Sequence, residues 1–413
     1  MSETTYDVIV VGAGQVGATL ALKLAPLLAA RGLRLALVEA SDAEPAVYRG
    51  EQFDPRVVAL TPASRRTYEQ LGLWRHIEAE RACPYRDMLV WDGEASGRIG
   101  FHADELDCDQ LGHIVENSVL VRHLRQALTY QSTVEWFRPS AVASLKQRDD
   151  GAVSVGLDTG HTLVAPLVIA ADGAHSRVRE LAGFNIREWP YEQKAIVTTV
   201  RTERPHGRTA RQRFMRTGPL AFLPLRCHWG EADAGEHPWD EHYSSIVWSA
   251  DSALADELLA LDDAAFCDRL GRDVEYTLGA VTGTDRRHGI PLYQRHARDY
   301  IRPGIALVGD AAHSIHPLAG QGVNLGLKDV RALYLEIERA LTRGLPLSEP
   351  SILRRYQRQR LGDNLGMMAT MEGFKRLFGS RSPAWIALRN TGLRRVDNLP
   401  LIKNTLAQKA MGV

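Results

Sequence analysis

The feature that most constrains the fold is an apolar stretch near the amino terminus that runs directly into a glycine motif. Residues 6–11 are rich in valine and isoleucine, which is typical of a strand buried on both faces of a parallel sheet. The pattern G-x-G-x-x-G follows over residues 12–17, and an apolar helical pattern then continues to about residue 31. A second strand, predicted over residues 34–38, ends in Glu39.

This order of strand, glycine motif, helix, strand and acid is the dinucleotide-binding fingerprint in its proper context. The glycines allow a tight turn, close approach to a pyrophosphate and close packing of the helix on the strand. Glu39 can bind the hydroxyls of an adenosine ribose. An acid at this position favours an unphosphorylated ribose, so NAD or FAD fits better than NADP.

Two further predicted strands also end at a glycine and an acid. Residues 163–171 form an apolar strand that ends at Asp172, and a short apolar strand from residue 305 ends at Asp310. In open α/β sheets the ligand lies along the carboxyl ends of the strands. Glu39, Asp172 and Asp310 are therefore predicted to converge on one long cofactor.

A loop rich in glycine and proline follows Asp310, and an amphipathic helix is predicted to begin near Val323. A glycine-lined helix start offers backbone N–H groups and a positive dipole end to an electron-rich group. His313 and His316 have helical spacing, but no acid or cysteine completes a metal site, so no metal is expected.

The middle of the chain has a different pattern. Between residues 195 and 249 short alternating strands predict an antiparallel sheet in a second domain, one face of which covers a pocket. Residues 84–91 are predicted as one strand leading out of the nucleotide-binding half, and residues 253–269 as one helix.

The predicted fold class is α/β (α+β), with a Rossmann-like nucleotide-binding domain, an interleaved antiparallel-sheet domain and a helical carboxyl-terminal region. The nucleotide-binding domain is assembled from three segments and the sheet domain from two. The predicted boundaries are 1–80, 111–185 and 291–345 for the first domain, 81–110 and 186–290 for the second, and 346–413 for the helical region.

Bulk composition excludes several classes. The chain has 413 residues, enough for two domains, and 50 basic residues balance 50 acidic ones, so a nucleic-acid binder is not indicated. The four cysteines are widely separated, which suits a reducing cytosol. Neither a signal peptide nor a run of eighteen apolar residues is present in the sequence, so a cytoplasmic location is expected.

The carboxyl-terminal region repeats large apolar residues at helical spacing, at Met367, Met371, Phe374 and Phe378. From residue 373 onward it carries eight Lys and Arg residues against one acid, Asp397. One interpretation is a packing helix with a solvated basic face. The other is a surface that docks on anionic lipid, at the inner face of the membrane, or on partner subunits.

The three strand-end motifs resemble those of the class A flavoprotein aromatic hydroxylases, which have the p-hydroxybenzoate hydroxylase fold. Within that class, four phrases are similar to the ubiquinone-biosynthesis hydroxylases, and the likeness runs from about residue 6 to residue 412. These phrases cover residues 111–117, 211–214, 218–225 and 316–326. Residues 111–119 with 90–92, and the tail 408–412, are most similar to the subgroup that hydroxylates ring carbon C5 of a polyprenylphenol.

The resemblance implies FAD at the fingerprint, with NADPH or NADH as a transient reductant and O2 as co-substrate. It places Arg56 and Arg122 near the pyrophosphate, although a surface role for Arg56 fits its spacing equally well. It places Asp310 at the ribityl chain, and Asp172, Gly173 and Arg179 at FAD and the transient NADPH. The isoalloxazine ring is implied to lie against Pro317, Gly320, Gln321, Gly322 and Asn324, around the start of the predicted helix. The implied FAD-binding residues are Gly12, Gly14, Gly17, Glu39, Arg56, Arg122, Asp172, Gly173, Arg179, Gly309, Asp310, Pro317, Gly320, Gln321, Gly322 and Asn324.

The implied reaction begins with reduction of the flavin by NAD(P)H. Addition of O2 at flavin C4a gives a hydroperoxide that delivers oxygen to an electron-rich phenol with a lipid tail. His113, Tyr293 and His316 are candidates for orienting or activating the phenol, but each is more often a structural residue, so the catalytic residue is left unassigned.

The sequence is also compatible with several other functions. The hydroxylated carbon could be C6 or C1 of the same pathway. A hydroxylase of a small soluble aromatic acid would need a cationic anchor in its pocket. A flavin reductase or halogenase shares the fold, but the W-x-W-x-I-P pattern of halogenases is absent from the sequence. A non-catalytic subunit of a ubiquinone-biosynthesis complex is a further alternative, against which the intact Asp172 and Asp310 argue.

Overall fold

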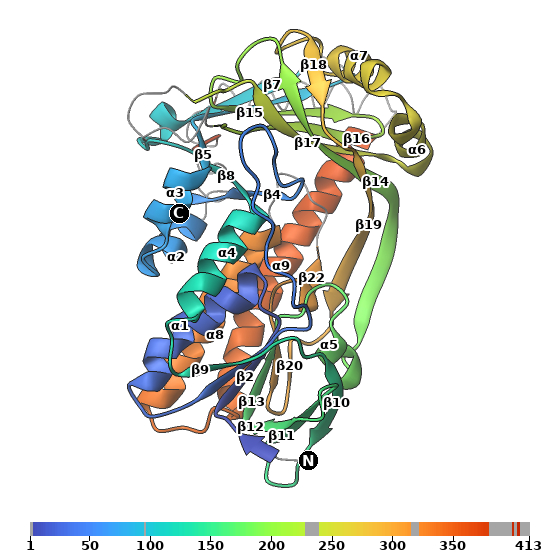
Figure 1. Ribbon diagram of the computed structural model, residues 1–413. Coiled ribbons are helices and arrows are strands. Elements are labelled where there is room, and N and C mark those ends of the chain that lie inside the picture. The colour runs from blue at the N-terminus through green and yellow to red at the C-terminus, as the bar shows by residue number, and fades with distance from the viewer. Residues whose placement is uncertain are drawn as a thin grey trace.

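The structure is a computed structural model, and it describes residues 3–94, 96–227, 239–314, 322–379, 399 and 403–404 of the chain. Within these residues the chain forms two halves. The lower half in Figure 1, here called the Rossmann half, is built on a six-stranded sheet; the upper half, the sheet half, is built on a nine-stranded sheet. A three-stranded sheet and a four-stranded sheet complete the described architecture.

The six-stranded sheet confirms the Rossmann-like prediction. Its strands, in spatial order, are β20 (Ile301–Arg302), β21 (Ile305–Leu307), β13 (Leu167–Ala170), β2 (Val8–Val11), β3 (Leu35–Val38) and β9 (Val134–Phe137). Neighbouring strands are parallel, except that β20 and β21 are antiparallel. Figure 1 shows the helices α1 (Gln15–Ala29), α4 (Asn117–Leu128) and α8 (Gly322–Thr342) packed side by side against it.

The four-stranded sheet corrects one prediction. Its strands are β1 (Glu3–Thr5), β12 (Thr162–Ala165), β11 (Val153–Leu157) and β10 (Val142–Gln147). Residues 163–171 were expected to form one strand, but β12 belongs to this sheet and β13 to the six-stranded sheet. Pro166 lies at the break, and proline has no N–H to donate to a continuing ladder.

The nine-stranded sheet confirms the antiparallel sheet predicted for the middle of the chain, while the predicted domain boundaries stay predictions. In spatial order its strands are β22 (His313–Ser314), β19 (His288–Ala297), β14 (Ile186–Thr202), β17 (Tyr243–Asp251), β16 (Gly218–Pro224), β15 (Thr209–Met215), β6 (Asp87–Asp92) and β7 (Arg98–His102), and β18 (Val281–Thr284) also pairs with β14. All pairs are antiparallel except β15 with β6. Figure 1 shows β14 and β19 running from the sheet half down to the Rossmann half, so these two strands join the halves.

Two boundaries in this region differ from the sequence prediction. Residues 84–91 form two strands, because β5 (Cys83–Tyr85) pairs with β8 (Gly112–Glu116) whereas β6 joins the nine-stranded sheet. Residues 253–269 form two helices, α6 (Ser252–Ala260) and α7 (Asp263–Asp273). The side chain of Asp262 accepts a hydrogen bond from the N–H of Ala265 at 2.8 Å and so caps a new helix start.

The three-stranded sheet, β4 (Val57–Leu60), β8 and β5, lies between the halves. The remaining elements are the helices α2 (Pro62–Gln70), α3 (Trp74–Glu80), α5 (Arg177–Leu181) and α9 (Pro350–Gly379), and 3₁₀ turns at Ala103–Leu106 and Gly309–Ala311.

The two faces of the nine-stranded sheet have different neighbours. Side chains of the outer face pack with α6 and α7, and they include Ile196, Leu220, Phe222, Ile246 and Trp248. Side chains of the inner face pack with residues of the three-stranded sheet and the segment before it, and they include Ala221, Leu223, Tyr243, Ala59, Ile114 and Phe53. Successive side chains in a strand point to opposite faces, so the sequence of each strand assigns its residues to one face or the other.

Helix α9 crosses from one half to the other in Figure 1 and confirms the predicted carboxyl-terminal helix. Near its end the ring of Phe378 stacks on Phe214 of β15, with 4.1 Å between centroids. Most of the predicted basic tail lies outside the described residues; within them Lys403 is paired with Glu105 at 2.7 Å. No helix in the described part of the chain has the length and apolarity needed to span a membrane.

Candidate cofactor-binding site

The glycines of the fingerprint fall into two kinds. A Cβ on Gly12, whose φ is +98°, would collide with the backbone at Ala171, and a Cβ on Gly17 would collide with the carbonyl of Gly12. Gly14 differs, because its φ of −75° suits any residue and no protein atom lies within 4 Å of the position of a Cβ. Gly14 is exposed at the N-terminus of α1, so the protein itself does not require a glycine there. A cofactor pyrophosphate approaching the N–H groups of α1 does require one.

Glu39 lies beside this loop. Its carboxylate accepts hydrogen bonds from the N–H of Ala13 at 2.7 Å and of Ser41 at 3.0 Å. Arg125 of α4 lies 3.4 Å from the same carboxylate and donates to the carbonyl of Ala13 at 3.1 Å. The strand-end acid and the glycine loop are therefore held together by an arginine that the sequence reasoning did not select.

Arg122, which was selected, is one helical turn away and faces elsewhere. Its guanidinium pairs with Glu80 of α3, and His123 lies 2.8 Å from the same carboxylate. Burial alone would raise the pKa of Glu80, but the hydrogen bonds from His123 and Arg122 outweigh it and lower the pKa to about 2. The pyrophosphate role of Arg122 stays a prediction, and Arg125 is the arginine in contact with the fingerprint loop.

The second motif is joined to the third by Arg179. Its guanidinium donates to the carbonyl of Ala174 at 2.8 Å, after the Asp172 motif, and to the carbonyl of Ala311 at 3.0 Å, after Asp310. Asp172 accepts a hydrogen bond from the N–H of Val178 at 3.1 Å through one oxygen, while its other oxygen is buried and has no partner in the described part of the chain. Burial raises the pKa of Asp172. An orphaned carboxylate oxygen at a strand end fits a site that a ligand completes.

Asp310 has several basic side chains in its surroundings. Its side chain is solvent-accessible, yet surrounding protein atoms desolvate it and raise the pKa of its carboxyl, while the charges of His313, Arg56 and Arg295 act in the opposite direction. Arg56 is exposed, and its guanidinium has no hydrogen-bond or ion-pair partner among the described residues. A free cation near Asp310 fits the pyrophosphate role expected for Arg56.

The loop that carries Asp310 is held from behind by Asp329 of α8, which is fully buried. One oxygen of Asp329 accepts from the N–H of Gly309 at 2.9 Å and lies 2.6 Å from His313. The other oxygen lies 2.7 Å from Nε of Arg360 on α9. Burial alone would raise the pKa of Asp329, but His313 and Arg360 outweigh it, so the pKa is lowered and the carboxylate stays charged.

The start of α8 is fixed by Asn324. Its side-chain amide donates to the carbonyl of Ala59 at 2.8 Å, and its oxygen accepts from the hydroxyl of Ser64 at 2.6 Å and the N–H of Thr61 at 3.1 Å. The side chain therefore joins α8 to β4 and α2. Gly322, by contrast, has open space where a Cβ would lie. Pro317, Gly320, Gln321 and His316 lie outside the described residues.

The segment at residues 111–117 also fixes the site. Glu116 forms a buried ion pair of 2.9 Å with Arg81 and accepts from the N–H of Asp54 at 2.7 Å. Asn117 accepts from the side chain of Gln15, in the first turn of α1, at 2.7 Å, and its N–H donates to the carbonyl of Arg56 at 2.8 Å. The segment therefore ties α1 to the strand of Arg56, a role the sequence did not reveal.

The two described catalytic candidates lie apart from the inner face of the sheet half. His113 is buried, its ring packs edge-on against Trp74 of α3, and neither ring nitrogen has a hydrogen-bond partner. Burial, with the charges of Arg65 and Arg226, lowers the pKa of His113 to about 3, so its imidazole is neutral at pH 7. Tyr293 of β19 is 38% exposed, with Arg295 over its ring. Neither geometry singles out a proton-transfer residue.

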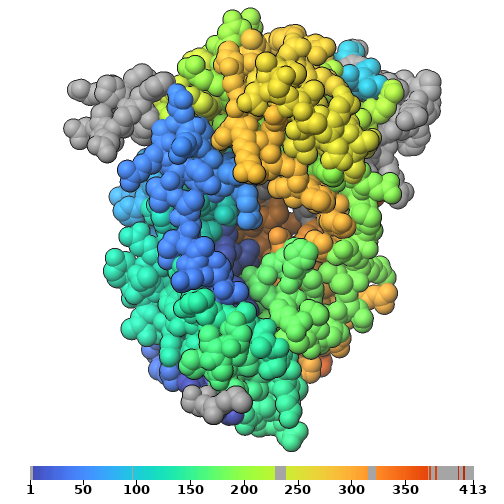
Figure 2. Space-filling view, turned by 45° about the vertical axis from the view of Figure 1, so that its right-hand side comes forward, coloured from blue at the N-terminus to red at the C-terminus, as the bar shows by residue number. Residues whose placement is uncertain are grey.

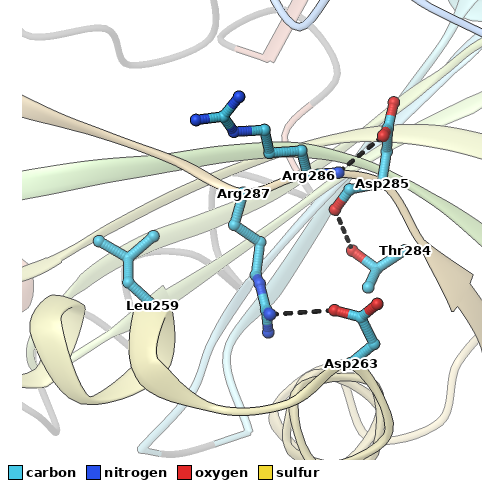
Figure 3. Close-up of a pocket in the computed structure, with 6 residues that line it drawn as sticks. All are labelled: Leu259, Asp263, Thr284, Asp285, Arg286 and Arg287. Atoms are coloured by element: carbon cyan, nitrogen blue, oxygen red, sulfur yellow. Dashed lines mark hydrogen bonds and ion pairs between the residues drawn. The ribbon is translucent and has the colours of Figure 1, made fainter.

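Two hollows are visible on the surface. Figure 2 shows one between the amino-terminal segment in blue, the middle segment in green and the orange segment that follows residue 280. Figure 3 shows another, lined by Leu259, Asp263, Thr284, Asp285, Arg286 and Arg287. In the second hollow Arg287 already pairs with Asp263 at 3.0 Å and Thr284 with the carbonyl of Asp285 at 3.1 Å. It contains none of the strand-end acids and is not the cofactor site.

Comparison with known proteins agrees with this geometry. The model of the FAD binding domain family matches residues 5–363. The chain is 36% identical over 414 residues to 3-demethoxyubiquinol 3-hydroxylase of Escherichia coli (strain K12), covering 100% of both chains. It is 34% identical to ubiquinone hydroxylase UbiL of Rhodospirillum rubrum, covering 100% of this chain and 90% of the relative. Ubiquinone biosynthesis monooxygenase COQ6 of Xenopus tropicalis is 32% identical, with 97% and 92% covered.

Solved structures show the same fold. PqsL, a probable FAD-dependent monooxygenase from Pseudomonas aeruginosa, superposes with a TM-score of 0.75 at 24% identity, covering 95% of this chain and 100% of that one. The p-nitrophenol 4-monooxygenase PnpA from Pseudomonas putida gives 0.73 at 19% identity, with 99% and 98% covered.

The open face at Gly14, the unpaired oxygen of Asp172 and the free cation at Arg56 fit FAD, and the class is that of the FAD-dependent monooxygenases. The chain belongs to the family of ubiquinone-biosynthesis hydroxylases within the class A flavoprotein hydroxylases. The resemblance to this family that was inferred from the three strand-end motifs is confirmed.

The substitution Gly14→Ala tests the open face of the fingerprint. We expect the Kd for FAD, measured by titrating the apoprotein, to rise by about tenfold or more, because a methyl group would lie between the loop and the pyrophosphate. The free energy of unfolding of the apoprotein should stay within about 1 kcal/mol of wild type, because the added methyl group meets no protein atom.

Gly362→Ala, in α9, is the matched control, because a Cβ there also has open space. It should leave the Kd unchanged and stabilise the helix by up to about 1 kcal/mol. An unchanged Kd for Gly14→Ala would contradict the assignment of this loop.

Asp329→Asn tests the support behind Asp310. We expect a loss of about 3–5 kcal/mol in the free energy of unfolding, measured by urea denaturation, because Arg360 loses its buried counter-ion. Weaker FAD binding should accompany this loss. Asp363→Asn is the control: Asp363 pairs with the same arginine at 2.5 Å but is 61% exposed, and its loss should cost less than about 1 kcal/mol. Equal effects of the two substitutions would contradict the role given to Asp329.

Proposed function

We propose that the chain hydroxylates the aromatic ring of a polyprenylated phenol or quinol in ubiquinone biosynthesis. NADPH or NADH is the reductant and O2 the co-substrate. Bound FAD supplies the oxygen-activating chemistry, and the chain holds the cofactor, orients the ring and excludes water. The support from comparison is that the relatives named for ubiquinone hydroxylation match this chain over nearly its whole length.

The observation that carries the substrate class is the character of the inner face of the nine-stranded sheet. In its central part the side chains are apolar or uncharged, and they are contributed by four neighbouring strands. By register they are Ala195, Val197, Thr199, Ala210, Gln212, Ala221, Leu223, Ser245 and Val247. The nearest arginine on this face, Arg201, is at the margin, 3.9 Å from Asp240 and stacked over Tyr243.

Such a face suits an uncharged ring with a lipid tail better than a carboxylate. A small aromatic acid would need a free cation to anchor it, and the central positions of this face carry no lysine or arginine. The soluble aromatic-acid alternative is therefore the weaker one.

Two ring positions are supported by different observations. The likeness of residues 111–119 to one subgroup favours C5 of a polyprenylphenol. The 36% identity to 3-demethoxyubiquinol 3-hydroxylase favours the C6 alternative equally. Peripheral docking on anionic lipid or on a biosynthetic complex stays a prediction, because most of the basic tail lies outside the described residues.

A substrate panel tests the proposal. Purified holoenzyme with NADPH should hydroxylate a short-chain polyprenylphenol or a short-chain demethoxyubiquinol, measured as product by mass spectrometry. 4-Hydroxybenzoate should give at most about 1% of that turnover, because its carboxylate has no partner on the inner face. The preferred member of the lipid-tailed pair assigns the ring position. Turnover of 4-hydroxybenzoate alone would contradict the proposal.

A further inference from the structure

Gln212 is a polar residue in the middle of the inner face of the sheet half. Its neighbours in β15, Arg211 and Arg213, point the other way, and Arg213 donates to the carbonyl of Asp273 in α7. In the register, Gln212 lies opposite Ala221 of β16 and Val90 of β6. The amide therefore extends from an apolar row on the side of the sheet that faces the Rossmann half.

Gln212 is a mostly buried residue whose amide is not used by the described part of the chain. The residue is 6% exposed, and its side chain makes no hydrogen bond to any residue that the structure describes. An amide that extends from an apolar row without a protein partner can take its hydrogen bonds from a ligand or from water. On the same face the hydroxyl of Ser245 is buried and has no hydrogen-bond partner among the described residues.

A series of side-chain contacts connects Gln212 to the candidate cofactor site. Asn324, at the start of α8, bonds to the carbonyl of Ala59 at 2.8 Å. The side chain of Ala59 packs in the same cluster as Ala221, and Ala221 is the cross-strand neighbour of Gln212. Gln212 is thus connected through Ala221 and Ala59 to the start of α8, which is expected at the flavin ring.

We propose that Gln212 binds an oxygen substituent of the substrate ring and so sets which ring carbon faces the flavin; this proposal rests on the proposed function. The amide group can donate to a methoxy or hydroxyl oxygen and accept from a phenol O–H. Apolar neighbours such as Val90 and Ala221 contact the ring itself. A site that pairs a buried amide with a substrate oxygen discriminates against an analogue lacking that oxygen.

The test compares Gln212→Leu with wild type on the better member of the lipid-tailed pair. We expect kcat/KM to fall by about tenfold or more, because the hydrogen bond to the ring oxygen is lost. We also expect the preference for this substrate over an analogue lacking the ring oxygen to disappear. A merely structural role predicts the opposite pattern, in which the substitution destabilises the substrate-free protein and leaves the preference intact.

Stability and FAD binding provide the controls. Because the amide has no hydrogen-bond partner among the residues that the structure describes, Gln212→Leu should unfold at the same or higher urea concentration and keep the wild-type Kd for FAD. Gln147→Leu, on the exposed strand β10, is the matched control and should not change kcat/KM. Gln212→Met, unbranched and of similar length, repeats the test if the leucine variant does not fold.

The outcomes separate the two proposals. If wild type turns over a lipid-tailed phenol and both Gln212 variants retain its kcat/KM and its preference, the role of Gln212 is overturned while the proposed function stands. If wild type turns over no lipid-tailed phenol, both are overturned.

Discussion

A buried carboxylate, Asp329, joins three segments of the Rossmann half. It takes an N–H from the strand-end loop at Gly309, an imidazole from His313 and a guanidinium from Arg360. Charges are costly to bury unless they are paired and hydrogen-bonded, so these groups fix one another. The loop bearing Asp310, the helix α8 and the helix α9 consequently occupy one arrangement, and this arrangement includes the strand end at which we expect the ribityl chain of FAD.

Other charged side chains around the candidate site also join segments that are distant in the sequence. Arg179 joins the loop after Asp172 to the loop after Asp310. Arg125 joins the fingerprint to Glu39, and the Glu116–Arg81 pair holds the segment before Arg56. Each of these charged groups is bonded to other groups of the protein. Among the described residues, the loop at Gly14, one oxygen of Asp172 and the cation of Arg56 remain open. The loop and the cation suit the phosphates of an anionic cofactor, and a carboxylate oxygen can accept hydrogen bonds from its hydroxyl groups.

The sequence revealed what depends on neighbours along the chain and missed what depends on distant ones. The fingerprint, the three acids and the antiparallel sheet follow from local spacing and alternation, and the family match confirms the class they indicated. The bonds of Asp329 to Gly309 and Arg360 span 20 and 31 residues, and that of Glu116 to Asp54 spans 62. Helical spacing shows that Arg122 and Arg125 share a helix but not which one meets the glycine loop. The prediction of one strand over residues 163–171 was wrong, because the apolar pattern continues across the strand break at Pro166.

We propose that this chain uses bound FAD to place an oxygen atom from O2 on the ring of a lipid-tailed phenol. The most direct measurement is the mass of the product formed by purified holoenzyme from a short-chain polyprenylphenol or demethoxyubiquinol, with NADPH, under ¹⁸O₂. The account predicts a product that carries one ¹⁸O atom on its ring, in an amount that follows the NADPH consumed. Consumption of NADPH and oxygen without labelled product from either compound would contradict it.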